Sequence, residues 1–468
     1  MSLTGQFRTK QIKVSKYSAG VIAAGYPKYY YITGGGTTYT YNGSAVSEEY
    51  LATLPDGAIG SVPSYFDLLD DFKTWVEAAE TGLDIDLTQS NQAYGEDAES
   101  CPIGNEPYAT VFATGENSNG QLGQGDTTDR DELDNVVLAN IRRADAGNNH
   151  SGAINSDGDL YMWGLNTSYQ LGDGTVTQRD SPVQIGTNTW EIISCGNTHS
   201  AGIDTDGFLW TWGSGANGKL GNGATTDETT PYKVGTNTWR WVSCGSGHTL
   251  AIRSDGTLWA CGDNSNGQLG DGTTTQRTSL VQIGIDFWYK VDAGNLHSIG
   301  ITAKGELYTW GDGSFGKLGL GTDTSDKTSP FLATDIPCLD CGAGHSHSIA
   351  LSVYRYVLTT GLNANGQLGN GTTTSQYAFN RTGDTNTLFV AAGSYHSLLI
   401  KPSGLSDGLN RPYATGFNGS GQLGTGDTTQ RNSFTEMEYE NILPYYDGLS
   451  VSGGNNHSLY VRYEGLAP

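Results

Sequence analysis

Residues 267–270 read GQLG, and variants of this phrase return six more times along the chain. Its leucines stand 49, 49, 49, 49, 50 and 55 residues apart; they are Leu122, Leu171, Leu220, Leu269, Leu318, Leu368 and Leu423. A fixed period of this size indicates one supersecondary unit that is repeated in a stack or a ring. A residue that recurs in every copy therefore builds the unit, and we expect function where the copies differ.

One copy, at residues 181–213, contains four short runs with the pattern of β-strands: SPVQIG, TWEIISCG, HSAGI and LWTWG. Asp206-Gly207 precedes the last run and is a strong signal for a hairpin turn. Other copies keep this turn signal, as Asp157-Gly158, Asp255-Gly256 and Lys304-Gly305. Four antiparallel strands per unit, joined by glycine-rich turns, are typical of a β-propeller blade.

The last copy is shorter than the others. Six full units are expected near residues 135–164, 181–213, 230–262, 279–311, 329–361 and 377–416. The seventh unit, near residues 433–463, has only three strand patterns before the sequence ends. Because an open ring leaves an exposed sheet edge, we expect residues 109–114 to supply the missing strand beside residues 457–463.

The repeat resembles that of the regulator of chromosome condensation family. The residues that carry the resemblance are GQLGxG, the segment TQRDSP at residues 177–182, the phrase [AC]GxxHS and the phrase DGxLYxWG, over about residues 108–463. The resemblance implies an all-β fold, a seven-bladed β-propeller of four-stranded blades. It implies little about activity, because this repeat serves many functions.

The first hundred residues have a different composition. KYYYIT at residues 28–33 and TTYTYNG at residues 37–43 predict a β-hairpin, and a capping signal at Ser64 and Asp67 predicts one helix near residues 65–81. We therefore expect three parts: a small mixed docking or oligomerisation module at 1–86, a polar linker at 87–107, and the propeller at 108–465.

The charge of the chain excludes several classes of partner. The net charge is −24, and we find no run of lysine or arginine that would neutralise phosphates, so we expect neither nucleic acid nor an anionic membrane surface as a partner. No apolar stretch approaches the length of a membrane helix. Cys195, Cys244 and Cys341 share one repeat position with small residues, which indicates buried thiols in a reducing cytosol rather than disulfides.

Histidine recurs at one place in the repeat. We interpret seven histidines as structural and regard His347 as an extra one; the seven are His150, His199, His248, His297, His345, His396 and His457. Cys338, Cys341, His345 and His347 have the residue types of a zinc site, but the repeat already accounts for two of them, so we expect no metal. We also find no catalytic or phosphate-binding motif and expect no cofactor and no enzymatic activity.

Other candidate residues follow from a recurring arginine and from two late insertions. Arg130, Arg179, Arg277 and Arg431 follow Thr-rich loops, where Glu228, Asp326 and Gln376 stand in other copies; we interpret them as partners in loop ion pairs, with a ring of anion-binding arginines as the alternative. The insertions at residues 401–412 and 438–450 enlarge loops, where binding usually resides. They nominate Arg411, Tyr439, Tyr445 and Tyr446 as binding residues.

These observations favour a non-enzymatic structural and binding protein. Its acidic, Gly/Thr/Asn/Tyr-rich composition is similar to that of phage virion and tail-associated proteins, so the leading expectation is a virion component that folds in the host cytoplasm. Residues 1–107 would join other structural proteins, and the propeller would bind a host-surface protein or glycan. The alternatives are an intracellular exchange-factor-like or scaffold propeller, cytoplasmic in location, and a secreted inhibitor-like propeller.

Overall fold

The computed structural model describes residues 109–402, 409–438 and 446–464, together with short strands within residues 12–86. The chain divides into two compact units, residues 1–106 with 303–305, and residues 107–302 with 306–468. The helix predicted at 65–81 and the linker predicted at 87–107 lie outside the described residues. Within the described part of the chain, no helix is long and apolar enough to cross a membrane.

The N-terminal unit contains a five-stranded antiparallel sheet and a separate pair of strands. The sheet has the order β6 (Tyr50–Thr53), β3 (Tyr29–Gly34), β2 (Ala19–Ala23), β1 (Ile12–Val14), β7 (Ile85–Asp86), and the pair is β4 (Tyr39–Tyr41) with β5 (Ser44–Val46). The hairpin predicted between residues 28–33 and 37–43 is therefore wrong. Strands β4 and β5 pair with Tyr41 opposite Ser44, and the sequence between them is Asn-Gly, a strong signal for a hairpin.

The larger unit consists of antiparallel strands, with 3-10 turns at η3 (Ala216–Gly218) and η4 (Ser314–Gly316). Four of its sheets have four strands each. They are β10 (Ile141–Ala146), β11 (His150–Asn155), β12 (Leu160–Gly164) and β13 (Arg179–Gln184); β24 (Cys338–Ala343), β25 (His347–Ser352), β26 (Val357–Gly361) and β27 (Gln376–Arg381); β28 (Phe389–Ala392), β29 (His396–Pro402), β30 (Asn410–Gly416) and β31 (Arg431–Glu436); and β32 (Tyr446–Gly453), β33 (His457–Glu464), β8 (Ala109–Gly115) and β9 (Arg130–Asn135).

A ten-stranded sheet completes the unit. Its strands are β14 (Trp190–Cys195), β15 (His199–Asp204), β16 (Phe208–Gly213), β17 (Glu228–Cys244), β18 (His248–Arg253), β19 (Thr257–Gly262), β20 (Arg277–Ala293), β21 (His297–Thr302), β22 (Leu307–Gly311) and β23 (Lys327–Thr334). The two long strands each serve two groups: the first part of β17 pairs with β16, and residues 239–244 pair with β18. The sheet is therefore three four-stranded groups joined through continuous strands.

The register of the strands corrects the unit boundaries predicted from the sequence. Residues 179–184, which we placed first in their unit, pair with β12 and form the outer strand of the preceding sheet, with Arg179 opposite Gly164. Each predicted unit is thus displaced by one strand from the sheet that forms. A sequence period does not determine where a sheet begins; the hydrogen-bonding register does.

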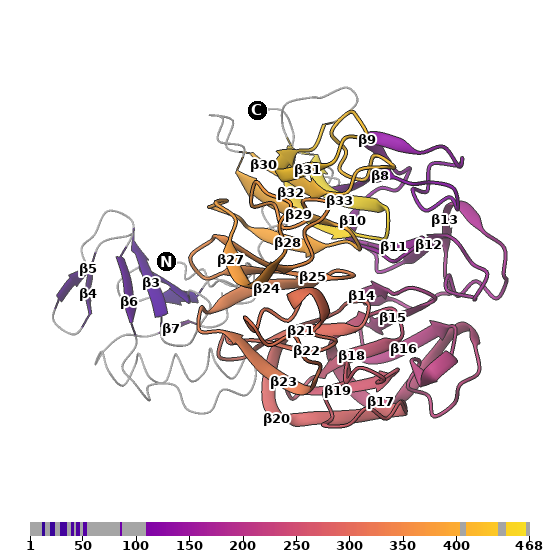
Figure 1. Cartoon of the computed structure of the whole chain (residues 1–468), viewed down its shortest axis with the longest axis horizontal. Helices are drawn as coiled ribbons and strands as arrows, with labels where there is room; N and C mark the ends of the chain where they lie inside the picture. The colour runs from indigo at the N-terminus through magenta and orange to yellow at the C-terminus, as the bar shows by residue number, and fades with distance from the viewer. Residues whose placement is uncertain are drawn as a thin grey trace. The chain divides into compact units, whose positions relative to one another are not determined.

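Both ends of the larger unit contribute to one sheet. Strand β8 pairs with β33, with Gly115 opposite His457 and Ala109 opposite Tyr463, and β9 pairs with the other edge of β8. Figure 1 shows the yellow β33 beside the purple β8. This sheet therefore has two strands from each end of the unit. The count of three plus one predicted from the sequence is wrong, because β31 belongs to the preceding sheet.

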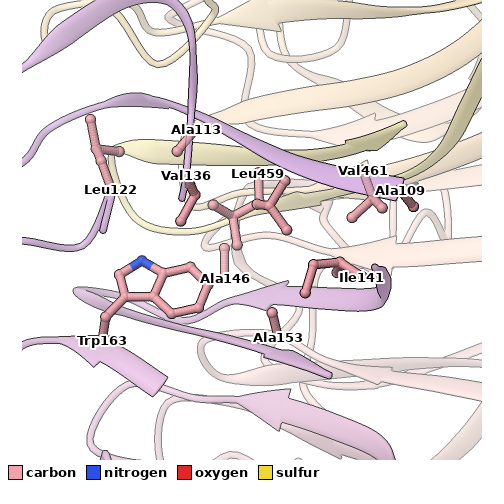
Figure 2. Packing of buried hydrophobic residues seen from close by; sticks show 11 residues of the cluster. Ala109, Ala113, Leu122, Val136, Ile141, Ala146, Ala153, Trp163, Leu459 and Val461 are labelled. Atoms are coloured by element: carbon pink, nitrogen blue, oxygen red, sulfur yellow. The ribbon is translucent and has the colours of Figure 1, made fainter. Parts of the chain in front are cut away.

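The first strands of successive groups contact one another in a closed cycle. Strand β10 contacts β14, and the contacts continue through β17, β20, β24, β28 and β32, which contacts β10 again. Hydrophobic clusters fill the spaces between neighbouring groups. In the cluster of Figure 2, Trp163 lies beside Ala146 within the group of β10, and Leu459 of β33 and Ala113 of β8 belong to the same cluster, which joins the two groups. Burial of one such large side chain stabilises the fold by roughly 1.5–3 kcal/mol.

Candidate protein-interaction face

Strand direction brings equivalent loops of every group to one face of the larger unit. In the group that begins with β14, the first strand ends and the second begins around residues 196–198, while the third ends and the fourth begins around residues 214–227. Because neighbouring strands are antiparallel, both segments lie at the same end of the strands. We call this end of all groups the rim face.

A cycle of seven hydrogen bonds lies just beneath the rim face. In each group the histidine at the start of the second strand places Nε2 2.8–3.0 Å from a serine or threonine hydroxyl of the next group. The pairs are His150–Ser200, His199–Thr249, His248–Ser298, His297–Ser348, His347–Ser397, His396–Ser458 and His457–Ser151. The last pair closes the cycle, so these side chains connect every group to its neighbour.

The hydroxyl partners determine the tautomer of these histidines. Ser151 Oγ donates its only proton to the carbonyl oxygen of Gln121 at 2.8 Å, and each of the other six hydroxyls likewise donates to a loop carbonyl of the preceding group. Each histidine therefore donates from Nε2 and carries no proton on Nδ1. Burial lowers the pKa of His150 to about 3 and that of His248 to about 4. Near neutral pH the rings are uncharged structural hydrogen-bond donors.

The structure changes the assignment of one histidine. His347, not His345, begins β25 and bonds Ser397 at 2.8 Å. Residues 341–345 and residues 343–347 both match the phrase [AC]GxxH, and the prediction of a structural His345 rests on the first match. The strand register selects the second, with Ala343 opposite Ser348. His345 is therefore the residue that departs from the repeat, and Ala343 rather than Cys341 occupies the small-residue position.

The side chains weighed as zinc ligands do not form a site. Cys338 and Cys341 are buried on β24, whereas His345 and His347 are engaged by other groups. Among the residues that the structure describes, no three His, Cys, Asp or Glu side chains are placed to hold a metal ion.

Of the four binding residues predicted from the insertions, only Arg411 has a described side chain. Arg411 Nη1 lies 2.6 Å from Glu436 Oε1, and the same carboxylate lies 3.2 Å from the Tyr413 hydroxyl, so this guanidinium has a counter-ion. Tyr439 and Tyr445 lie outside the described residues. Tyr446 begins β32 and its backbone pairs with that of Glu464, but its side chain is outside the description.

The arginines of the Thr-rich loops form local ion pairs with nitrogen–oxygen distances of 2.6–2.8 Å. The pairs are Arg130–Asp126, Arg179–Asp173, Arg277–Asp271 and Arg431–Asp427. The loop between β22 and β23 is longer. There Lys327, rather than Asp326, stands at the position of the arginines and pairs with Asp323. Since each of these cations has a carboxylate partner in its own loop, the cations do not form a free anion-binding ring.

One position of the rim face is small and polar in six groups and differs in the seventh. The six are Asn148, Asn197, Ser246, Asn295, Ser394 and Asn455, and the exception is His345. Asn295 Nδ2 donates to His345 Nε2 at 2.9 Å, so the ring proton lies on Nδ1, 2.9 Å from Ser346 Oγ. The imidazole stacks on Tyr395, with ring centroids 5.3 Å apart. His345 thus connects three consecutive groups and is held in one orientation.

Other aromatic residues of the rim face lie in the same group as His345 or in the groups directly before and after it. We define the aromatic sector as Phe315, His345, Tyr377, Tyr395 and Phe417. Phe315 is 52% exposed and adopts φ 61°, and the neighbouring Tyr377 is 48% exposed. A left-handed backbone is strained for phenylalanine, and the fold does not bury its ring. No motif or insertion in the sequence points to the sector, because its residues lie inside the repeats. The signal is the departure of these residues from the equivalent positions of the other copies.

Comparisons with known proteins identify the repeat. The family model described as RCC1-like domain matches residues 109–399. The X-linked retinitis pigmentosa GTPase regulators of mouse and human are 47% and 43% identical over 58 residues, which is 12% of this chain and only 6% of each relative.

Two solved structures share the fold. The Prp20p structure from Saccharomyces cerevisiae, described with its binding properties to Gsp1p and histones, has a TM-score of 0.68 and 19% identity and covers 80% of this chain and 95% of its own. Human WBSCR16 has a TM-score of 0.66 and 18% identity and covers 75% and 98% of the two chains.

These relatives correct the expected function. The expectation of a virion or tail-associated component rests on composition alone. The matched proteins come from mouse, human and yeast, and their names refer to GTPase regulation or to binding of Gsp1p and histones. The virion assignment is therefore wrong, since an acidic, glycine-rich composition follows from the repeat itself and does not distinguish one host of the fold from another.

Proposed function

This chain belongs to the RCC1-like domain family, and on that premise we propose that it is an exchange-factor-like, protein-binding β-propeller. It acts by binding a small GTPase through the aromatic sector of the rim face. The observation that carries the proposal is the stack of His345 on Tyr395, because it is a rigid, partly exposed break in a ring that otherwise repeats.

Seven blades are part of the proposal. Two features support this number: the cycle of contacts between seven first strands, and the cycle of seven histidine bonds that runs from His150 to His457 and returns to Ser151. A closed ring of this kind holds the aromatic sector on a rigid support, so a partner does not have to order it on binding.

The chemistry of the sector suits a protein partner. Tyrosine, phenylalanine and histidine rings offer large contact area with few rotatable bonds, and aromatic residues dominate the energetics of protein interfaces. The names of the matched proteins, a GTPase regulator and a protein described with Gsp1p, supply the partner class. Release of a nucleotide through binding alone requires no nucleophile and no proton carrier from this chain, and we propose no enzymatic activity.

We also propose an intracellular location. The five cysteines of the described part are unpaired and buried, and burial raises the pKa of Cys244 and that of Cys338 to about 12. Free thiols in this number suit a reducing compartment.

The test measures nucleotide release from purified Gsp1p loaded with a fluorescent GDP analogue. The full chain is expected to accelerate the release and to bind the GTPase in titrations. The double variant His345→Asn/Tyr395→Asn places residues of other copies at both positions, so the fold is retained; we expect binding at least about tenfold weaker, as for loss of an interface hot spot.

Asn197→Ser is the matched control, because it changes the same repeat position three groups away and Ser246 shows that serine fits there. It is expected to leave binding unchanged. A panel of other small GTPases is tested in parallel. Failure of the full chain to bind any of them, or equal binding by the double variant, would remove the basis of the proposal.

A further inference from the structure

A hairpin turn on the face opposite the rim face departs from the repeat. Between β25 and β26 the chain reads Val-Tyr-Arg-Tyr at residues 353–356. Four other groups have an acidic or basic residue followed by glycine at the corresponding place: Asp157-Gly158, Asp206-Gly207, Asp255-Gly256 and Lys304-Gly305. Tyr354 and Arg355 therefore replace a dipeptide that the fold uses elsewhere for a tight turn.

Arg355 adopts a backbone conformation that favours glycine. Its φ is 65°, and the four glycines at the same position have φ between 82° and 90°. A hydrogen bond fixes this conformation: the backbone N–H of Thr387 in the next group donates to the Arg355 carbonyl at 3.0 Å, as the N–H of Trp190 does to Gly158 at 2.8 Å. The fold requires the turn and the carbonyl but not the arginine side chain, which strains the turn.

The Arg355 guanidinium lacks a counter-ion within the described part of the chain. No ion pair and no side-chain hydrogen bond is formed by it there, although the residue is half-buried. The nearby carboxylate of Asp340 forms an ion pair with Lys290 and accepts the backbone N–H of Val390. Desolvation lowers the pKa of Arg355. A partner that brings a negative charge would therefore offset the free-energy cost of a half-buried guanidinium without a counter-ion.

Aromatic and cationic side chains lie at the same turn. Tyr354 is 65% exposed and stacks on Tyr356, with ring centroids 5.9 Å apart and an interplanar angle of 12°. The exposed Arg381 lies with Cζ 3.6 Å from the centre of the Tyr356 ring. The turn thus carries an exposed tyrosine and an arginine, with a second arginine on the neighbouring strand, in a chain whose net charge is −24.

We propose that Tyr354, Arg355 and Arg381 form a second interaction surface, separate from the aromatic sector, which binds an acidic peptide segment of a protein partner. A carboxylate of the segment pairs with Arg355 in the fork geometry that guanidinium favours, and a flat apolar side chain covers Tyr354. Charge complementarity selects this occupant, because a basic segment would meet two guanidiniums, whereas a carboxylate supplies the missing counter-ion.

The test measures fluorescence anisotropy of a labelled peptide, Glu-Glu-Glu-Phe-Glu-Glu-Glu, titrated with the full chain at low salt. We expect binding that weakens on raising the salt to about 150 mM. Arg355→Gly restores the turn used by the other groups. It is expected to raise the melting temperature by about 1–3 °C and to weaken peptide binding at least about tenfold, so that loss of binding cannot reflect loss of folding.

Tyr354→Ser is a second variant that leaves the turn residue in place and is also expected to weaken binding. Arg253→Gln is the matched control, because Arg253 precedes the equivalent turn of another group and pairs with Asp255 at 3.5 Å; it should bind as the parent does. Equal binding by Arg355→Gly and the parent, or equally tight binding of the same peptide with lysine in place of glutamate, refutes the surface. Tighter binding of a single-stranded oligothymidylate assigns the surface to nucleic acid and refutes the peptide.

Discussion

Acidification should weaken the larger unit through its buried histidine cycle. The perturbation is a change of pH from 7 to 5. In the folded state burial lowers the pKa of His248, His347 and His457 to about 4, whereas the ordinary value is 6.5. The unfolded chain therefore binds more protons than the folded chain below pH 6.5. The stability that these groups contribute is complete above that pH and is lost as the pH falls towards 4.

The magnitude follows from the two pKa values. At pH 5 a histidine that titrates near 6.5 when unfolded and near 4 when folded favours the unfolded chain by about 2 kcal/mol. The three histidines named above together remove about 6 kcal/mol, a large share of the 5–15 kcal/mol that holds a typical domain folded. The other members of the cycle act in the same direction, because burial lowers the pKa of each of them.

The assay is urea unfolding at several pH values between 7.5 and 5, followed by tryptophan fluorescence at constant ionic strength. His248→Asn is expected to be less stable than the parent at pH 7 and to lose about 2 kcal/mol less on going to pH 5, since it has one titrating group fewer. Leu258→Ala, a core variant that also destabilises, should keep the full pH dependence of the parent. If the parent loses no stability by pH 5, or if His248→Asn loses as much as the parent, the histidines are not buried and neutral as described.

Three further outcomes follow from the packing. Removing residues 1–136 takes away β8 and β9, exposes the edge of β33 and should lower the melting temperature sharply or cause aggregation; a fragment of residues 137–468 that melts like residues 107–468 contradicts the two-plus-two closure. Trp163→Ala leaves a cavity in the cluster of Figure 2 and removes the hydrogen bond from the indole N–H to the Gln121 carbonyl. Unfolding in urea should therefore show a free energy of unfolding lower by about 3–5 kcal/mol. Arg179→Ala breaks a loop ion pair whose guanidinium is partly exposed, and thermal unfolding should report less than about 1 kcal/mol; a larger effect would mean that these loops stabilise the ring.

The sequence determined the repeating unit, because the same local chemistry returns at each copy. The spacing of Leu122 to Leu423 and the turn dipeptides such as Asp206-Gly207 predict short antiparallel strands in a repeating β-fold, and the antiparallel sheets and the family match agree with this. Short-range turn preferences and alternating strand patterns act within a few residues and can be recognised in one sequence. Recurrence also separated the residues that build the unit from those that differ between copies.

Tertiary structure decided everything that depends on which strands pair. The boundary of each sheet, the two strands that each end gives to the closing sheet, and the choice of His347 over His345 all follow from register. Two overlapping matches to one phrase are equivalent in the sequence, and only the hydrogen bond from His347 to Ser397 distinguishes them. The aromatic sector likewise unites residues from three consecutive groups, and the strain at Arg355 exists because its carbonyl accepts a hydrogen bond from Thr387 in the next group. Long-range pairing sets these features, and no local pattern contains it.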